Sequence, residues 1–210
     1  MHIPDGFLNV QTWVSMDVVA GLGVAYAIRK TKTGLGERQI PLMGVMAAFI
    51  FAAQMLNFPI AGGTSGHLIG GVMAGVLLGP WAATLVMSTI FIVQCLLFQD
   101  GGLTALGANI FNMGIIGTVF GYYIYRGVAI SIGGKRGLFW GVGIASWLAV
   151  VLAATLCSIE LAFSGTVPLR IALPAMAGVH VLIGIGEAII TVGVISLILR
   201  ARPDLLQKYG

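Results

Sequence analysis

The chain has 210 residues, of which 58% are hydrophobic and only 9% are charged, with a formal net charge of +4 and a mean hydropathy of +1.01. A soluble domain carries about 25% charged residues and cannot bury this much apolar surface, and a disordered chain needs higher charge and lower hydrophobicity. We therefore expect an all-α, polytopic membrane protein with a single integral membrane domain over residues 1–210 and no nucleic-acid partner.

Seven apolar segments follow one another, each bounded by charged residues or by glycine, proline or asparagine. A bilayer core needs about 20 apolar residues per helix, so a chain of this length has room for six to eight spans. The third segment is short for a full crossing, and Gly79-Pro80 separates it from the fourth. After a loop over residues 1–10, we predict spans at about 11–28, 40–56, 66–78, 81–98, 106–125, 138–163 and 173–199.

The basic residues test this count, because lysine and arginine collect on cytoplasmic loops. Three basic groups lie between spans one and two, between spans five and six, and after span seven: Arg29, Lys30, Lys32 and Arg38; Arg126, Lys135 and Arg136; and Arg200, Arg202 and Lys208. With seven spans all three groups fall on one side and only Arg170 falls on the other. The pattern predicts an extracytoplasmic amino terminus and a cytoplasmic carboxyl terminus.

The first residues, Met1-His2-Ile3-Pro4-Asp5-Gly6, form a chelating unit if Met1 is the free amino terminus. A signal peptide has basic residues before its apolar run, whereas here they follow it, so we expect the mature protein to keep Met1. The terminal amine, the amide nitrogen of His2 and its imidazole Nδ1 can hold an ion with three coplanar nitrogens, which suits Ni(II) or Cu(II). The turn-forming segment at Pro4-Asp5-Gly6 favours folding of this end back into the protein.

A fourth nitrogen donor should be another imidazole near the outer face. The chain has three histidines, and His67 lies in the glycine-rich segment 62–67 on the same side as Met1. His180 lies deeper, in the outer half of span seven. A lone histidine in either place is also consistent with ordinary packing, so the joint pattern with the Met1-His2 terminus is what favours a metal site.

Six blocks of the sequence together resemble the CbiM/NikM family, the substrate-binding (S) component of energy-coupling factor (ECF) transporters for nickel or cobalt. The blocks are residues 1–6, 62–68, 79–82, 98–102, 105–109 and 178–187. The resemblance implies that Met1, His2 and His67 hold the ion in a planar nitrogen site. It also implies a prokaryotic cell (inner) membrane location, and as partners a transmembrane coupling subunit, two ATP-binding cassette ATPases and a small accessory membrane subunit.

The chain has no phosphate-binding loop of the type G-x-x-x-x-G-K-[ST], and Gly133-Gly134-Lys135 has the wrong spacing. We therefore expect no enzyme activity in this chain, with ATP hydrolysis on separate partner subunits. We also expect no cofactor, with Ni(II) or Co(II) bound as the transported substrate. Which of the two ions is the physiological one stays open, because nitrogen donors bind both.

Other polar and small residues are weaker candidates for a functional role. His180 and Glu187 are seven residues apart on one helix face and either orient the metal ligands, pair with each other or with Asp17, or form a buried structural network. Asp5, Thr64 and Ser65 are further candidates for support of the site. Ala48 and Ala52 form a small-xxx-small pattern that suits docking of the coupling subunit or internal helix packing. We expect Cys95 and Cys157 to be inert buried thiols.

Two other functions remain as alternatives. A self-sufficient secondary metal transporter or channel would also place ionisable residues at membrane depth, as Asp17, His180 and Glu187 are expected to be. A membrane enzyme is disfavoured, because the sequence has no nucleophile–base pair and no H-E-x-x-H motif.

Overall fold

The computed structural model describes residues 1–206 apart from 33, 35, 37 and 38, so Arg38 and Lys208 lie outside the described residues. A short antiparallel hairpin pairs β1 (Phe58–Pro59) with β2 (Ser65–Gly66). A π-helix, η1 (Ile110–Phe120), joins α5 to α6 without a break, and a 3-10 turn, η2 (Pro203–Leu205), follows α8. The α-helices are α1 (Val10–Thr31), α2 (Gln39–Gln54), α3 (Gly71–Leu78), α4 (Pro80–Phe98), α5 (Leu106–Asn109), α6 (Gly121–Ile132), α7 (Gly134–Phe163) and α8 (Leu169–Ala201).

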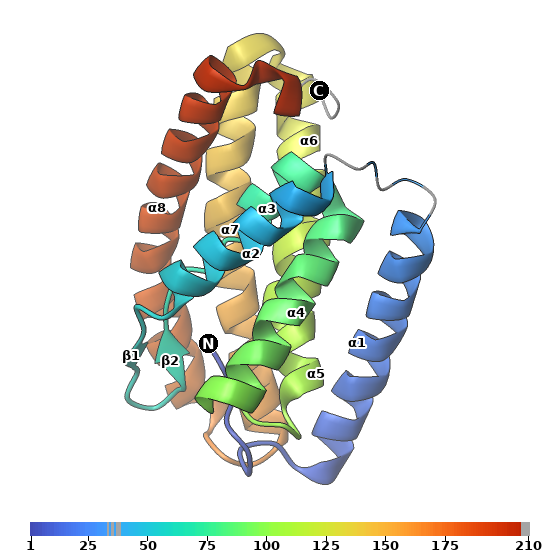
Figure 1. The fold of residues 1–210 in the computed structure, drawn as a ribbon. Helices are drawn as coiled ribbons and strands as arrows, with labels where there is room; N and C mark the ends of the chain where they lie inside the picture. Colours follow the sequence, from blue (N-terminus) through green and yellow to red (C-terminus); the bar gives the residue numbers. More distant parts are fainter. Residues whose placement is uncertain (33, 35, 37–38, 207–210) are drawn as a thin grey trace.

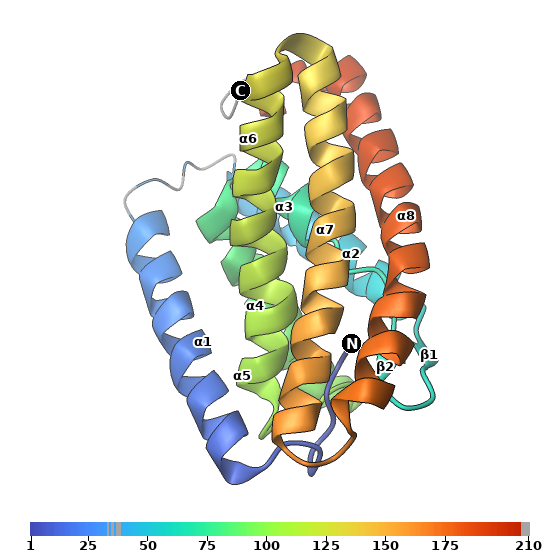
Figure 2. The same ribbon diagram turned by 180° about the vertical axis from the view of Figure 1, so that it is seen from behind.

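The long helices form an elongated bundle, which α2 crosses obliquely on one side (Figure 1). Seen from behind, α6, α7 and α8 lie side by side as one layer, with α1 at the opposite edge (Figure 2). The end of α1, the turn between α6 and α7, and the end of α8 all lie toward the end of the bundle that holds the C-terminus (Figure 1). The basic residues in the last turns of α1 and α8 therefore lie toward one end, namely Arg29, Lys30 and Arg200.

Among the described residues, four helices are long and apolar enough to cross a membrane: α4, the continuous helix Leu106–Ile132, α7 and α8. The continuous helix has 27 residues, which at 1.5 Å per residue exceeds the roughly 30 Å hydrocarbon core of a bilayer. α2 is apolar but has only 16 residues. α3 lies at the centre of the bundle, and all of its residues are buried, as expected for a helix that is apolar on every side.

The third predicted span is shorter in the structure, because its helix begins at Gly71 rather than at residue 66. Gly70 has a φ of +78°, and the amides of Ile69 and Gly70 donate to the side chain of Glu187 instead of to a helical carbonyl. The segment 67–70 therefore enters the bundle as irregular, non-helical chain. The break expected at Gly79-Pro80 is present, with Gly79 at a φ of +81° and Pro80 in the first turn of α4.

The fifth span is longer than the sequence suggests. The helix continues past residue 125 to Ile132, so Arg126 lies on α6 rather than in a loop. Only Gly133, with a φ of +76°, separates α6 from α7. Gly134 also has a positive φ, of +59°, so two glycines without a Cβ reverse the chain here.

Close packing of α1 against α5 depends on Gly107. A Cβ at this position would lie 2.3 Å from Asp17 Oδ1 and 2.4 Å from the Asp17 Cα. We expect Gly107→Ala to lower the melting temperature in detergent by roughly 3–10 °C, because overpacking costs about 1–3 kcal/mol. The matched control is Gly21→Ala on α1, where an added Cβ meets no described atom within 4 Å. Equal melting temperatures for the two variants would contradict this account of the α1–α5 contact.

Candidate metal centre

The amino-terminal segment folds back into the bundle, so that Met1, His2 and Ile3 are almost fully buried. Both the amide and the carbonyl of Ile3 form hydrogen bonds. Its amide donates to Asn109 Oδ1 at 2.8 Å, and its carbonyl accepts from Asn109 Nδ2 at 3.1 Å and from the Gly102 amide at 2.8 Å. These bonds fix the depth at which Met1 and His2 enter the protein.

Asp5 anchors the segment at the surface. Its carboxylate accepts from the Leu103 amide at 3.0 Å, from the Thr104 amide at 2.8 Å and from Thr104 Oγ1 at 2.6 Å. The hydrogen bond from the Thr104 hydroxyl is the main reason why the pKa of Asp5 lies below its usual value. Asp5 therefore supports the amino-terminal loop and does not point at the metal centre.

The low pKa of Asp5 sets the pH range of this anchor. A carboxylate whose pKa is depressed in the folded protein stabilises it above the unfolded pKa, and the effect is lost as the pH falls through the folded pKa. We expect hydrogen exchange at the Ile3 amide to show constant protection from pH 8 to about 5 after correction for intrinsic rates. Asp5→Ala should speed exchange a few-fold over that range, because hydrogen bonds to an exposed group contribute about 0.5–1 kcal/mol. Unchanged exchange in the variant would show that Asp5 is not an anchor.

The Met1 amine has one lone pair available for an ion. It donates to the backbone carbonyl of Ser65 and to Ser65 Oγ at 2.8 Å. Burial lowers its pKa to about 5, so the amine is neutral at pH 7. A neutral amine has two N–H bonds and one lone pair, and Ser65 accepts both N–H bonds. The nitrogen can therefore bind a cation without first losing a proton at neutral pH.

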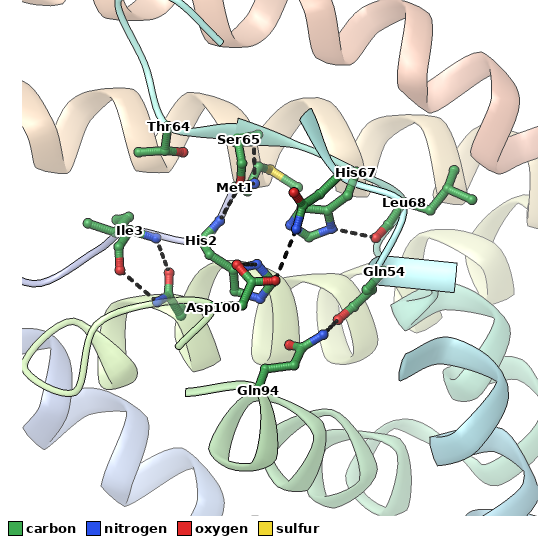
Figure 3. A network of polar contacts seen from close by, with 12 residues as sticks. Met1, His2, Ile3, Gln54, Thr64, Ser65, His67, Leu68, Gln94 and Asp100 are labelled. Atoms are coloured by element: carbon green, nitrogen blue, oxygen red, sulfur yellow. Dashed lines mark hydrogen bonds and ion pairs between the residues drawn. The ribbon is translucent and has the colours of Figure 1, made fainter. Parts of the chain in front are cut away.

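The imidazoles of His2 and His67 stack on each other, with ring centroids 4.6 Å apart and an interplanar angle of 15° (Figure 3). His67 Nδ1 lies 2.7 Å from the carbonyl oxygen of Leu68, and since a carbonyl can only accept, Nδ1 carries the proton. His67 Nε2 then has a lone pair. It is buried and has no hydrogen-bond partner among the described residues, which is the state expected of a free metal ligand.

His2 faces a carboxylate, Asp100, for which the sequence alone predicts no role. His2 Nδ1 lies 3.2 Å from Asp100 Oδ1, and Asp100 Oδ2 accepts from Asn57 Nδ2 at 3.1 Å. Burial favours a lower pKa for His2, while Asp100 opposes this shift. Burial alone would raise the pKa of Asp100, but its contacts with His2 and Asn57 outweigh burial and lower it. Asp100 thus competes with an ion for the chelating nitrogen of His2.

Chelation requires local changes in this arrangement. Ser65 Oγ accepts from the His2 amide at 3.2 Å as well as from the Met1 amine. An ion bound by the amine, the deprotonated amide and Nδ1 would replace the amide contact with Ser65 and the Nδ1 contact with Asp100. No group of three His, Cys, Asp or Glu side chains converges in the described part of the chain. An ion at this position therefore needs the amine and amide nitrogens of the terminus.

Two glutamines link α4 and α2 to the His67 segment. Gln94 Nε2 donates to Gln54 Oε1 at 2.9 Å, and Gln54 Nε2 donates to the carbonyl of Ile69 at 2.7 Å (Figure 3). Both side chains are fully buried. The sequence pattern does not indicate Gln54, because a single amide in an apolar helix carries no spacing signal.

His180 and Glu187 do not pair with each other or with Asp17 in the described structure. The Glu187 carboxylate accepts from the amides of Ile69 at 2.7 Å and Gly70 at 2.6 Å. His180 Nδ1 bonds the carbonyl of Met176 at 2.7 Å, and its buried Nε2 has no partner among the described residues. Asp17 Oδ1 accepts from the Gly107 amide at 2.8 Å.

Thr64 contacts sulfur atoms beside the metal centre. Its amide lies 3.4 Å from Met176 Sδ, and its hydroxyl lies 3.8 Å from Cys157 Sγ. Cys157 is buried and is a free thiol, as is the partly exposed Cys95. Thr64 therefore holds its loop against α7 and α8, and among the described residues its side chain bonds neither His2 nor His67.

Ala48 and Ala52 lie away from the metal centre, on α2. Both are exposed, as are their neighbours Val45 and Phe49. The face that they form is therefore open, and internal packing does not account for the pattern.

Known proteins resemble the chain over almost its whole length. Residues 2–205 match the family model described as "CbiM: Cobalt uptake substrate-specific transmembrane region". A relative from Archaeoglobus fulgidus, named as a fused nickel transport protein NikMN, is 42% identical over 99% of this chain and 68% of its own length. The fused nickel transport protein NikMN of Rhodobacter capsulatus is 37% identical over 98% of this chain and 64% of its own length.

The fold also matches a solved structure. The crystal structure of a transition metal transporter superposes with a TM-score of 0.89 at 34% sequence identity, and covers 95% of this chain and 93% of that chain. Family model, relatives and structure agree with one another, and the four long apolar helices agree with a multi-pass location in a membrane. The chain therefore belongs to the CbiM family of transmembrane metal-transport proteins.

Proposed function

We propose that this chain is the substrate-specificity subunit of an ECF-type ABC transporter, which captures Ni(II) or Co(II) from outside the cell and delivers it for ATP-driven uptake. One observation carries the proposal: the buried Met1 amine lies beside two buried imidazoles that stack on each other (Figure 3). Met1, His2 and His67 are the proposed ligands. The ion is the substrate of the subunit and not a resident cofactor.

The donor set supports Ni(II) or Co(II) over harder cations. Amine, amide and imidazole nitrogens suit late first-row metals, whereas Mg(II) and Ca(II) prefer oxygen ligands. Removal of the amide proton favours metals that tolerate a planar arrangement of nitrogens. Both nickel and cobalt are named among the relatives of this chain.

The proposed topology has seven crossings, with the amino terminus outside and the carboxyl terminus inside. It is supported by the gathering of basic residues from α1 and α8 toward one end of the bundle. The proposed metal centre then lies toward the outer side of the membrane, from which the ion is captured. Under this topology α1, α2 and α3 are the three further crossings, in addition to the four longer helices.

The proposed partners are a transmembrane coupling subunit, two ATP-binding cassette ATPases and a small accessory membrane subunit. The chain itself has no phosphate-binding loop, so ATP hydrolysis is assigned to the partners. Two relatives named as fused proteins extend well beyond the part that this chain matches, which supports a need for further components. The open face at Ala48 and Ala52 is the proposed contact with the coupling subunit, because small residues permit close helix approach.

Metal-edge X-ray absorption on the protein with a native Met1 tests the proposal. We expect a nitrogen-only coordination sphere around Ni(II), and at least about a 100-fold loss of affinity when two glycines are added before Met1. Two are added rather than one, because a single glycine would place this histidine third in the chain, where the new amine, two amides and the imidazole form a complete planar chelate. The extension converts the Met1 amine into an amide and lengthens a terminus that is almost fully buried. The control is the extended protein after proteolytic restoration of Met1. Equal affinity with and without the added glycines would rule out the Met1 amine as a ligand.

A further inference from the structure

A groove lies at the end of the bundle that is far from the amino terminus. A cavity of about 500 Å³ opens between α6, α7, α8 and the turn η2. Its lining is mostly apolar, with two basic side chains at its edge; the lining residues include Tyr125, Arg126, Lys135, Leu138, Leu199 and Leu206. The metal centre shares none of these residues.

The walls of this groove are fixed by close helix packing. A Cβ on Gly137 would lie 2.4 Å from the carbonyl oxygen of Ala129, and a Cβ on Gly141 would lie 2.6 Å from that of Tyr125. α6 and α7 therefore touch backbone to backbone along this wall of the groove. On the other side η2 turns the chain so that Leu206 is buried.

The charges at the groove are unbalanced. Arg126 and Lys135 are exposed, and within the described residues neither forms an ion pair. Arg202, the residue before η2, differs because it is paired with Asp204. Both of its contacts with the Asp204 carboxylate are 2.9 Å long. A groove with an apolar floor and two uncompensated cations at its rim is complementary to an anionic amphiphile.

The location of the groove indicates which class of anionic amphiphile it can bind. Its walls are the ends of three helices that are long and apolar enough to span a bilayer. The apolar floor then lies at the depth of acyl chains, and the cations lie at the depth of lipid headgroups. Basic pockets between membrane helices are the usual binding sites for anionic headgroups.

We propose that this groove binds an anionic phospholipid, with Arg126 and Lys135 on the phosphate and the leucine-lined floor on the upper part of an acyl chain. Small phosphate esters share the headgroup chemistry but leave the apolar floor uncovered. The proposal does not depend on metal binding, since it needs only the membrane location and the groove.

Native mass spectrometry of the full chain in detergent tests the proposal with added phosphatidylglycerol or phosphatidylcholine. We expect phosphatidylglycerol to bind at least about tenfold more tightly than phosphatidylcholine. The double variant Arg126→Gln/Lys135→Gln should lose about 10- to 30-fold in affinity for phosphatidylglycerol. The charge-matched control, Arg29→Gln/Lys32→Gln on and beside α1, should bind it as the unaltered chain does. A melting curve checks that each variant is folded.

Three results would overturn the proposal. One is equal binding of the two lipids, and another is equal loss of affinity in both double variants. The third is binding of inorganic phosphate or glycerol phosphate with the affinity of the whole lipid, which would assign the groove to a soluble anion. Substitution of Leu138 by serine distinguishes the last case further, because it weakens only a ligand that has an acyl chain.

Discussion

Replacement of His2 by alanine is expected to weaken Ni(II) binding by at least about 100-fold, equivalent to about 2.8 kcal/mol. The substitution removes the imidazole that closes the second chelate ring, and leaves the amine and the amide as a two-nitrogen fragment. It also removes the ring that stacks on His67. Isothermal titration calorimetry on purified protein with a native Met1 measures the affinity, and a melting curve in the same detergent reports whether the fold persists.

The other two histidines provide the comparison. His67→Ala should match His2→Ala, because it removes the unpartnered Nε2 lone pair. His180→Ala removes an equally buried imidazole from α8, but one that is proposed only to support the site, so its affinity should fall by less than about tenfold. If His180→Ala lost as much affinity as His2→Ala, the proposed ligand set would be incorrect.

The sequence was sufficient to predict the general architecture. High hydropathy and low charge identify a helical membrane protein, and glycine and proline identify the break before α4. Segment 67–70 was predicted as helix because its composition is apolar. The sequence gives no sign that the amides of Ile69 and Gly70 bond a carboxylate on α8, more than 100 residues away. Such a contact depends on tertiary packing, which local pattern does not report.

The candidate metal centre, too, could be predicted from the sequence only in part. Met1, His2 and His67 could be proposed from chelate chemistry and from the family motifs. Asp100 could not, since a single aspartate after a helix is usually a solvated residue. Its role beside His2 follows from the left-handed conformation of Gln99, with a φ of +54°, which ends α4 and turns the chain back toward the amino terminus. Ser65 was proposed from its neighbourhood, but its contacts with the amine and the His2 amide required the folded structure.

Glu187 is expected to have the largest effect on metal affinity of any residue that does not bind the ion itself. Its carboxylate accepts from the backbone amides of Ile69 at 2.7 Å and Gly70 at 2.6 Å, directly after Leu68. Leu68 is also the residue whose carbonyl fixes the tautomer of His67. Glu187→Ala leaves two buried amide groups without that acceptor, at a cost of about 1–3 kcal/mol for each. We expect a melting temperature lower by several degrees and a loss of Ni(II) affinity of about 10- to 100-fold.

The test must separate a role in positioning His67 from a general loss of stability. Glu160 on α7 is the matched control, because it is also a buried carboxylate and accepts from Asn112 Nδ2 at 2.7 Å. Glu160→Ala should lower the melting temperature comparably but leave Ni(II) affinity within about threefold. Glu187→Gln should lie between wild type and Glu187→Ala, because its amide offers one acceptor oxygen and turns a donor toward the second backbone amide. If the two alanine variants lose metal affinity in proportion to their loss of stability, Glu187 does not position His67, and the segment 67–70 is held by the rest of the bundle.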